Sequence, residues 1–217
     1  MNCKHCCGAD QFFDMKGAQK QLKIFKKKGA GKSTKRLLKI LHLQDIQGKT
    51  LLDIGGGIGA IQWSFLENGG KNTLGVDASR GYIKVAETYA VENDFIEKSQ
   101  FLFGDFVDKS EEIPSHDFVT LDKVVCCYPD YQSLIGKSIG KCNKIIALTY
   151  PLGGPISKIT AMFENIYFYF KKNPFHIYIH SPREIERFII SKGFAPVQKK
   201  ISFPWHVQVY SKVKTTN

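Results

Sequence analysis

The segment that decides the fold reads Leu51-Leu52-Asp53-Ile54-Gly55-Gly56-Gly57-Ile58-Gly59-Ala60. A short apolar run leads into four glycines, and apolar residues at helical spacing then continue to Glu67. This order predicts a buried strand, a tight turn and a helix. Glycines let a backbone approach a ligand closely, and a helix N-terminus presents unpaired N–H groups. The turn therefore predicts a ligand site, although Gly55, Gly57 and Ala60 also fit the dinucleotide pattern.

Strand and helix patterns alternate on both sides of this turn. Strands are expected at residues 49–54, 73–76, 100–103, 118–125 and 144–150, and helices at 14–28, from Ser33 or Thr34 onward, 58–67, 79–92 and 181–191. Such alternation is typical of right-handed βαβ units and a parallel sheet. Residues 194–203 and 205–212 read as a closing hairpin around Pro204. We predict an α/β fold with a Rossmann-like, mostly parallel seven-stranded sheet, into which the hairpin inserts one antiparallel strand.

Three carboxylates mark the carboxyl ends of the first three strands, where parallel sheets bind ligands. Asp53 lies two residues before Gly55, at a position where dinucleotide-binding strands usually carry an apolar residue. A cationic ligand suits a carboxylate there, whereas a pyrophosphate does not. Asp77 ends the second strand, where it can accept from both ribose hydroxyls, and Asp105 ends the third, where it can accept from an adenine amino group.

These segments resemble the three cofactor motifs of class I S-adenosylmethionine-dependent methyltransferases. The motifs are Leu51 to Ala60, Val76-Asp77-Ala78-Ser79 and Phe103-Gly104-Asp105-Phe106. The hairpin is similar to the sixth and seventh strands of that family, so the resemblance covers roughly residues 35–212. Within the class, the chain looks like the small-molecule branch that includes ubiquinone-pathway and magnesium-protoporphyrin O-methyltransferases. The resemblance implies S-adenosylmethionine as the donor and S-adenosylhomocysteine as the product.

The resemblance also assigns residues to the cofactor. Gly55 and Gly57 would line its methionine part, and Asp53 would orient the methionine amino group. One departure is Ile58, where many members have a threonine that can contact the methionine carboxylate.

The remaining cofactor residues follow the second, third and fourth strands. Asp77, with Ala78 beside it, would hold the ribose, and Asp105 with the Phe106 backbone would read the adenine. Asp122, at the fourth strand, completes the predicted set.

The acceptor side is less specific. Tyr128 and His180 are the candidates for contact with the acceptor or for a general base, because histidine suits proton transfer near neutral pH. Packing of a loop explains Tyr128 equally well, and a lone histidine is more often structural. The Asn/Asp-Pro-Pro-aromatic motif of amino-methylating enzymes and the Pro-Cys pair of C5-cytosine enzymes are both absent. Cys127 is therefore not expected to act as a nucleophile.

An aromatic segment follows the fifth strand, with Phe163, Tyr167, Phe168, Tyr169 and Phe170 close together. Such a stretch more often belongs to a core than to a pocket. Its place as an insertion at about residues 151–181 also suits a lid over the acceptor. We accordingly divide the chain into a basic N-terminal helical arm, residues 1–47, and a methyltransferase domain, residues 48–217.

The net charge of +11 is concentrated near the N-terminus. Residues 15–44 contain no acid and hold ten cations, from Lys16 to Lys39, which leaves 11 − 10 = +1 for the rest of the chain. Such an arm suits nucleic acid, anionic lipid or an acidic substrate, or it is simply a solvated helix face. No apolar run reaches the roughly 20 residues of a transmembrane helix. With no signal-like N-terminus, a cytoplasmic protein is expected.

The cysteines do not predict a metal site. Cys3 and Cys6 have the C-x₂-C spacing of a zinc knuckle, but no second pair completes it. Reduced thiols on a frayed end are expected for Cys3, Cys6 and Cys7, and Cys126-Cys127 has no assigned role.

The predicted function is transfer of a methyl group from S-adenosylmethionine to a small lipophilic or aromatic acceptor. The aromatic segment favours this acceptor class. An RNA or protein methyltransferase that uses the basic arm is the first alternative. A non-catalytic S-adenosylmethionine-binding protein and a nicotinamide-dependent oxidoreductase are the others.

Overall fold

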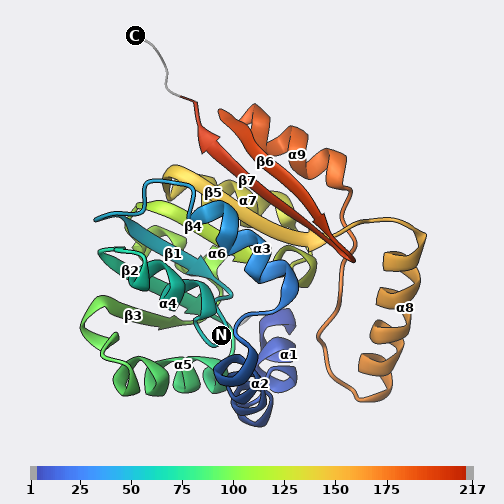
Figure 1. Ribbon diagram of the computed structural model, residues 1–217. Coiled ribbons are helices and arrows are strands. Elements are labelled where there is room, and N and C mark those ends of the chain that lie inside the picture. The colour runs from blue at the N-terminus through green and yellow to red at the C-terminus, as the bar shows by residue number, and fades with distance from the viewer. Residues whose placement is uncertain (1–3, 214–217) are drawn as a thin grey trace.

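A seven-stranded sheet with the strand order β3-β2-β1-β4-β5-β7-β6 organises the molecule (Figure 1). The structure, a computed structural model, describes residues 4–213. The strands β1 to β5 run parallel, and β7 lies antiparallel between β5 and β6. Their bounds are β1 (Thr50–Ile54), β2 (Asn72–Asp77), β3 (Ser99–Phe103), β4 (His116–Asp122), β5 (Cys142–Pro151), β6 (Phe194–Ser202) and β7 (Trp205–Lys212). The predicted α/β fold and its closing hairpin are confirmed.

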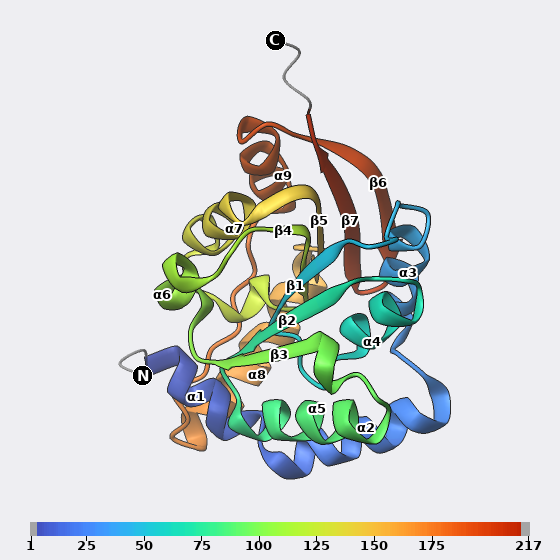
Figure 2. The same ribbon diagram turned by 90° about the vertical axis from the view of Figure 1, so that its left-hand side faces the viewer.

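Helices cover both faces of the sheet, with α6, α7 and α9 on one side and α3 and α4 on the other (Figure 2). The helices are α1 (Lys4–Phe12), α2 (Met15–Lys28), α3 (Lys32–Leu41), α4 (Ala60–Glu67), α5 (Arg80–Glu92), α6 (Phe106–Lys109), α7 (Tyr131–Gly140), α8 (Pro155–Phe170) and α9 (Pro182–Ser191). Short 3₁₀ turns lie at Ile96–Lys98, Ser110–Glu112 and Val125–Cys127. This layering explains why β1 is apolar in sequence: Leu51 packs with α3 and α4, while Leu52 packs with α7 and α9.

The N-terminal helices pack on the body of the protein. In α3, Leu37 and Leu41 are buried against the sheet. In α2, Ala18 is buried against Val85 of α5. Asp14 caps α2, as its side chain accepts from the Gly17 N–H at 2.7 Å.

Two predicted boundaries are wrong. The fourth strand ends at Asp122 and not at Val125, because Lys123 adopts a left-handed backbone (φ 65°) and a 3₁₀ turn follows. Continuous apolar residues made this turn look like strand. The third helix begins at Lys32 with Gly31 as its N-cap, so neither Ser33 nor Thr34 is the cap. Both side chains are buried in the first helical turn.

Four helices were not predicted, namely α1, α6, α7 and α8. The expectation of a frayed cysteine-bearing end is wrong for Cys6, which lies in α1 and is 3% exposed. Cys3 lies outside the described residues. Little in the composition of α1 indicates a helix, since it begins with polar and sulfur-containing residues and includes Gly8. Tertiary packing stabilises it, because a Cβ on Gly8 would lie 2.3 Å from the Phe175 backbone.

The aromatic segment forms α8, which stands beside the sheet at one edge of the molecule (Figure 1). The interpretation of this segment as core is wrong. Phe168 is buried, but Phe163, Tyr167, Tyr169 and Phe170 are exposed.

Candidate cofactor and acceptor site

A cavity of about 1060 Å³ opens at the carboxyl ends of the central strands. This volume lies at the upper end of the roughly 300–1,000 Å³ that is usual for ligand pockets. All eight residues predicted to bind the cofactor line this cavity, namely Asp53, Gly55, Gly57, Asp77, Ala78, Asp105, Phe106 and Asp122. Tyr128 also lines it. His180 is not among the lining residues. The sheet therefore brings together the eight predicted cofactor residues and Tyr128, while the role of each residue stays a prediction.

The glycine turn forms one wall of this cavity. Gly55, Gly57 and Gly59 all have left-handed backbones, with φ of 65°, 58° and 80°. A Cβ on Gly55 would lie 2.3 Å from a methyl carbon of Val124. The turn therefore needs glycine both for its conformation and for its close approach to the loop after β4.

Asp53 lies at the floor of the cavity and is 1% exposed. Its Oδ1 accepts a hydrogen bond from the Thr120 hydroxyl, while Oδ2 is buried and accepts no hydrogen bond of ordinary length and angle from the described residues, although the nearby Gln62 amide favours its charged form. Burial, with a smaller contribution from Asp122 and Asp77, raises the pKa of Asp53 to about 7. A buried carboxylate oxygen without a donor is costly, so this atom fits a ligand that brings a positively charged donor.

Asp77 ends β2 beside the glycine turn. Its Oδ2 accepts from the Gly57 N–H at 2.9 Å, and its Oδ1 accepts from the Ser79 N–H at 2.8 Å. Burial raises the pKa of Asp77 to about 6, against the opposing effect of these hydrogen bonds. Each carboxylate oxygen has two lone pairs. The two N–H groups thus orient the carboxylate and still leave acceptor capacity for hydroxyl groups.

Asp105 joins three parts of the chain. Its Oδ1 accepts from the Val107 N–H at 2.8 Å and thereby caps α6. Its Oδ2 accepts from the Tyr128 hydroxyl at 3.0 Å and from the Cys6 thiol at 3.3 Å. A ligand amino group would share the carboxylate with these donors or displace one of them.

Asp122 is held by protein groups at the end of β4. Thr149 donates to its Oδ1, Thr34 donates to its Oδ2 at 2.6 Å, and the Lys123 ammonium lies 3.4 Å from Oδ2. Lys123 also donates to the Thr34 hydroxyl at 3.0 Å. This network fastens α3 to β4 and β5. The sequence assigned Thr34 only to a helix start, and no signal at either position indicated the pairing with Asp122.

His180 and Cys127 each donate a hydrogen bond to a backbone carbonyl. His180 donates from Nε2 to the Tyr128 carbonyl oxygen at 2.9 Å, and its ring lies 4.9 Å from that of Tyr131. It therefore fixes the backbone of Tyr128. The Cys127 thiol donates to the Lys123 carbonyl at 3.5 Å, and its neighbour Cys126 together with burial raises its pKa well above the ordinary value. A neutral thiol is a poor nucleophile.

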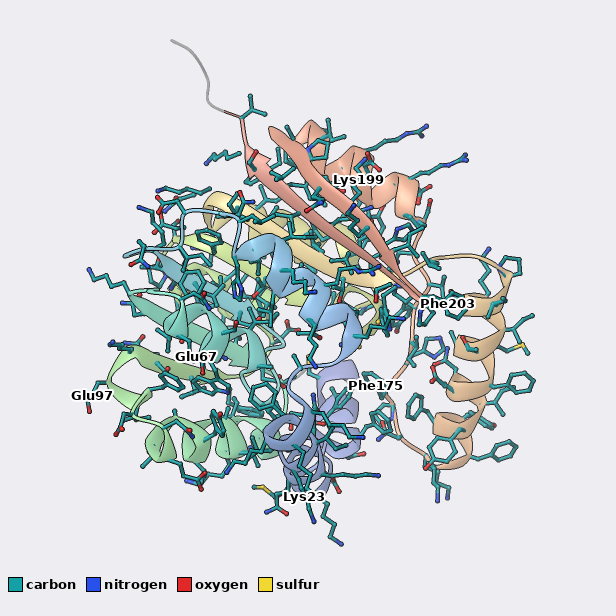
Figure 3. The ribbon with its side chains drawn as sticks, viewed as in Figure 1. Lys23, Glu67, Glu97, Phe175, Lys199 and Phe203 are labelled. Atoms are coloured by element: carbon teal, nitrogen blue, oxygen red, sulfur yellow. The ribbon has the colours of Figure 1, made fainter. Side chains whose placement is uncertain are left out.

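The rest of the cavity wall is apolar and aromatic. Five of its rings were not predicted to belong to the site: Phe12, Phe13, Phe25, Phe175 and Trp205. The other three, Phe163, Tyr167 and Phe168, come from the aromatic segment for which a lid over the acceptor was one expectation. Phe175 lies between α1 and α8 (Figure 3) and packs edge-on against Phe168 at a centroid distance of 5.1 Å. Helical spacing places Ala161, Glu164 and Phe168 on one face of α8, but spacing alone does not indicate that this face, and not the more apolar one, meets the cavity. Within residues 4–213, no group of three or more His, Cys, Asp or Glu side chains is arranged to hold a metal ion.

No family model and no curated protein matches this sequence. Solved structures do match its fold. A magnesium protoporphyrin IX methyltransferase from Synechocystis PCC 6803, solved with bound SAH, is 15% identical with a TM-score of 0.71, over 94% of this chain and 98% of that chain. An O-methyltransferase family protein from Burkholderia thailandensis is 12% identical with a TM-score of 0.67, over 84% of this chain and 57% of that chain.

A proposed RNA methyltransferase from Pyrococcus horikoshii is 18% identical with a TM-score of 0.61, over 82% of this chain and 83% of that chain. At these identities the likeness establishes the fold, and neighbours with different acceptors share it. The chain therefore has the Rossmann-like fold of the class I S-adenosylmethionine-dependent methyltransferases.

Proposed function

We propose that this protein binds S-adenosylmethionine and transfers its methyl group to a small lipophilic or aromatic acceptor. The observation that carries the proposal is the unpartnered Oδ2 of Asp53 at the floor of the cavity. The methionine ammonium supplies a charged donor for such an atom. Asp77 and Asp105 lie at the ends of the two neighbouring strands, as the ribose hydroxyls and the adenine amino group require.

The cofactor supplies a methyl group that is already activated by the positive charge on sulfur. The reaction forms a bond from the acceptor atom to the methyl carbon while the carbon–sulfur bond breaks, and S-adenosylhomocysteine leaves with the electron pair. The protein has to hold the acceptor atom close to the methyl carbon and in line with the carbon–sulfur bond. Such positioning lowers the activation free energy by on the order of 7–11 kcal/mol. The aromatic wall excludes water, and the acceptor proton passes to solvent or to a group beside it.

Tyr128 is the residue we assign to the acceptor side, because it lines the cavity and its hydroxyl is fixed by Asp105. His180 supports it from behind through the backbone and is not assigned a proton-transfer role. Glu164 is the carboxylate that α8 contributes to the cavity wall. It is the group we propose to receive a proton from an acidic hydroxyl.

A lipophilic or aromatic acceptor is favoured by the cavity wall around Phe163, Phe168 and Trp205. The alternative, an RNA acceptor, is supported by the exposed lysines on α2. Its signature is binding of RNA that weakens steeply with salt and is lost when the exposed lysines of α2 are changed to glutamine, which leaves the cavity lining intact. The same lysine variant with no effect on RNA binding favours the small acceptor.

Calorimetry tests the cofactor site directly. S-adenosylmethionine and S-adenosylhomocysteine are titrated into the wild type, Asp77→Ala and the control Asp45→Ala, whose carboxylate is 75% exposed and distant from the cavity lining. We expect the wild type and the control to bind alike. Loss of two charge-assisted hydrogen bonds in Asp77→Ala should weaken binding by roughly 10- to 1,000-fold. A well-folded wild type that binds neither compound contradicts the proposal.

A further inference from the structure

The two faces of α8 differ in an unusual way. The face toward the cavity carries small or polar residues, Ser157, Thr160, Ala161 and Glu164, together with the rings of Phe163, Tyr167 and Phe168. Large apolar residues recur at helical spacing around the rest of the helix, with Phe163 at the border of the two faces, and all of them are exposed: Ile156, Ile159, Met162, Phe163, Ile166, Tyr169 and Phe170. We call these seven residues the α8 stripe. A helix that packs only on its own protein would place them inward.

The α8 stripe is extensive for an exposed surface. Tyr169 and Phe170 are 79% and 77% exposed, and Ile156 and Phe163 are each 62% exposed. The 16-residue helix is about 24 Å long, so the stripe spans most of one side of α8. Contiguous apolar surface of this kind marks a binding face.

The tip of the β6–β7 hairpin extends the same surface. Ile201 and Phe203 are exposed there, at 57% and 67%. The Leu152 N–H, just before α8, donates to the Pro204 carbonyl at 3.0 Å, so the hairpin tip and the start of α8 are joined. Figure 3 shows Phe203 at this tip, on the side of the molecule from which α8 projects.

Positive charge borders the stripe. Lys158, Lys171 and Lys172 are exposed at the two ends of α8. Glu164 is the single acid between residues 152 and 181, and it belongs to the cavity face. On the hairpin, Lys200 is also exposed. Aromatic and branched apolar residues flanked by lysines are typical of helices that lie in the interface of an anionic bilayer.

We propose that the α8 stripe docks this protein on the surface of an anionic lipid membrane. The charges favour lipid over a second copy of the chain, because pairing two stripes would bring the lysines of both α8 helices together between chains of net charge +11. No helix among residues 4–213 is long and apolar enough to cross a bilayer, so the contact is with the interface alone.

Docking has a consequence for the cavity. Phe163 and Tyr167 line the cavity and are also exposed on α8, so the helix separates the cavity from the membrane face by one layer of side chains. A lipophilic acceptor could then reach Tyr128 from the lipid without crossing water. This consequence rests on the proposed function, whereas docking itself does not.

Vesicle flotation with the full chain tests the docking. The probes are vesicles of phosphatidylcholine alone and of phosphatidylcholine mixed with phosphatidylglycerol. The test variant is I166Q/Y169Q/F170Q, which leaves the cavity lining intact. The matched control is L43Q/V91Q, which removes apolar side chains that are 77% and 61% exposed away from α8. Circular dichroism and a cooperative thermal unfolding transition verify that each variant is folded.

We expect the wild type and the control to float with the anionic vesicles and much less with neutral ones. The α8 variant should lose at least about tenfold in partitioning, because three apolar side chains no longer enter the interface. K158Q/K171Q/K172Q should lose about fivefold for each lysine and most of its salt dependence. Failure of the proposed function would leave these results unchanged, since they need no turnover.

Three results would overturn the proposal. The first is a folded wild type that stays with neither kind of vesicle. The second is an α8 variant that floats as well as the control. The third is a concentration-dependent dimer in sedimentation that the α8 variant abolishes, which assigns the stripe to a second copy of the chain.

Discussion

The two halves of the cavity are built differently. The half that we propose for the cofactor, here called the cofactor half, consists of short polar groups at the ends of adjacent strands, with Asp53, Asp77 and Asp105 on β1, β2 and the loop after β3. The half that we propose for the acceptor, the acceptor half, consists of large apolar side chains from α1, α2, α8 and the hairpin, which are far apart in sequence. The positions of the groups in the cofactor half follow from the local backbone geometry of successive βαβ units. The acceptor half depends on how distant elements pack, and it leaves part of α8 uncovered.

If backbone geometry sets the cofactor half, its glycines are the most sensitive positions. Gly59→Ala should destabilise the protein by about 3–5 kcal/mol, because the left-handed backbone disfavours a Cβ. That Cβ would also lie 2.3 Å from the buried Trp63 ring. Denaturant unfolding measures the loss. Gly140→Ala is the control, since nothing lies within 4 Å of its Cβ. Equal stability of the two variants would show that the turn tolerates side chains.

The floor of the cofactor half predicts a pH dependence. The pKa of Asp53 is raised in the folded protein to about 7, so the folded state holds a proton that the unfolded chain releases near pH 4. Stability from this group is therefore present below pH 4 and is lost as the pH rises toward 7, by on the order of 2–4 kcal/mol. Unfolding measured between pH 4 and 8 should show a steep slope in the wild type, whereas Asp53→Asn should keep only the smaller part that Asp77, whose pKa is also raised, contributes.

Ligand binding sharpens the same measurement. A cationic donor on Oδ2 favours the charged carboxylate, so saturating S-adenosylhomocysteine should flatten the pH slope of the wild type. It should leave Asp53→Asn nearly unchanged in slope. A slope that persists with ligand bound would place the positive group elsewhere.

The seam between the halves is the network of Asp122. Thr34→Val removes the hydroxyl that donates to Asp122 and accepts from Lys123, and the loss should cost about 1–2 kcal/mol of stability. Thermal unfolding measures it against Thr88→Val, whose exposed hydroxyl donates only within α5. If Thr34→Val is as stable as its control, α3 is held by apolar packing alone.

The smallest effect is expected where both halves share a residue. Tyr128→Phe removes one hydrogen bond to Asp105 and should weaken cofactor affinity by less than about tenfold, since a single hydrogen bond contributes ~1 kcal/mol. Its effect on kcat should be larger if Tyr128 contacts the acceptor. Tyr131→Phe, which keeps the ring beside His180, is the control. If the substitution lowers cofactor affinity more than kcat, Tyr128 contributes to cofactor binding and not to the acceptor side.

Sequence determined the sheet and the cofactor half of the site. The strands of a parallel sheet are buried on both faces, so each appears as an apolar run that ends at a glycine or an acid. Because the carboxyl ends of parallel strands meet at one edge, the positions of Asp53, Asp77 and Asp105 in the sequence already indicate that these side chains lie together. Left-handed glycines such as Gly55 and Gly57 mark the turn for the same local reason.

Only the tertiary structure decided the acceptor half. Whether the rings of residues 163–170 lie inside or outside depends on what α8 packs against, and helical periodicity alone does not say which side faces the protein. The turn at Lys123, the helix around Cys6 and the partnership of Thr34 with Asp122 are likewise set by contacts between residues some 90 positions apart. Such contacts leave no local pattern, because each partner alone is an ordinary residue in an ordinary element.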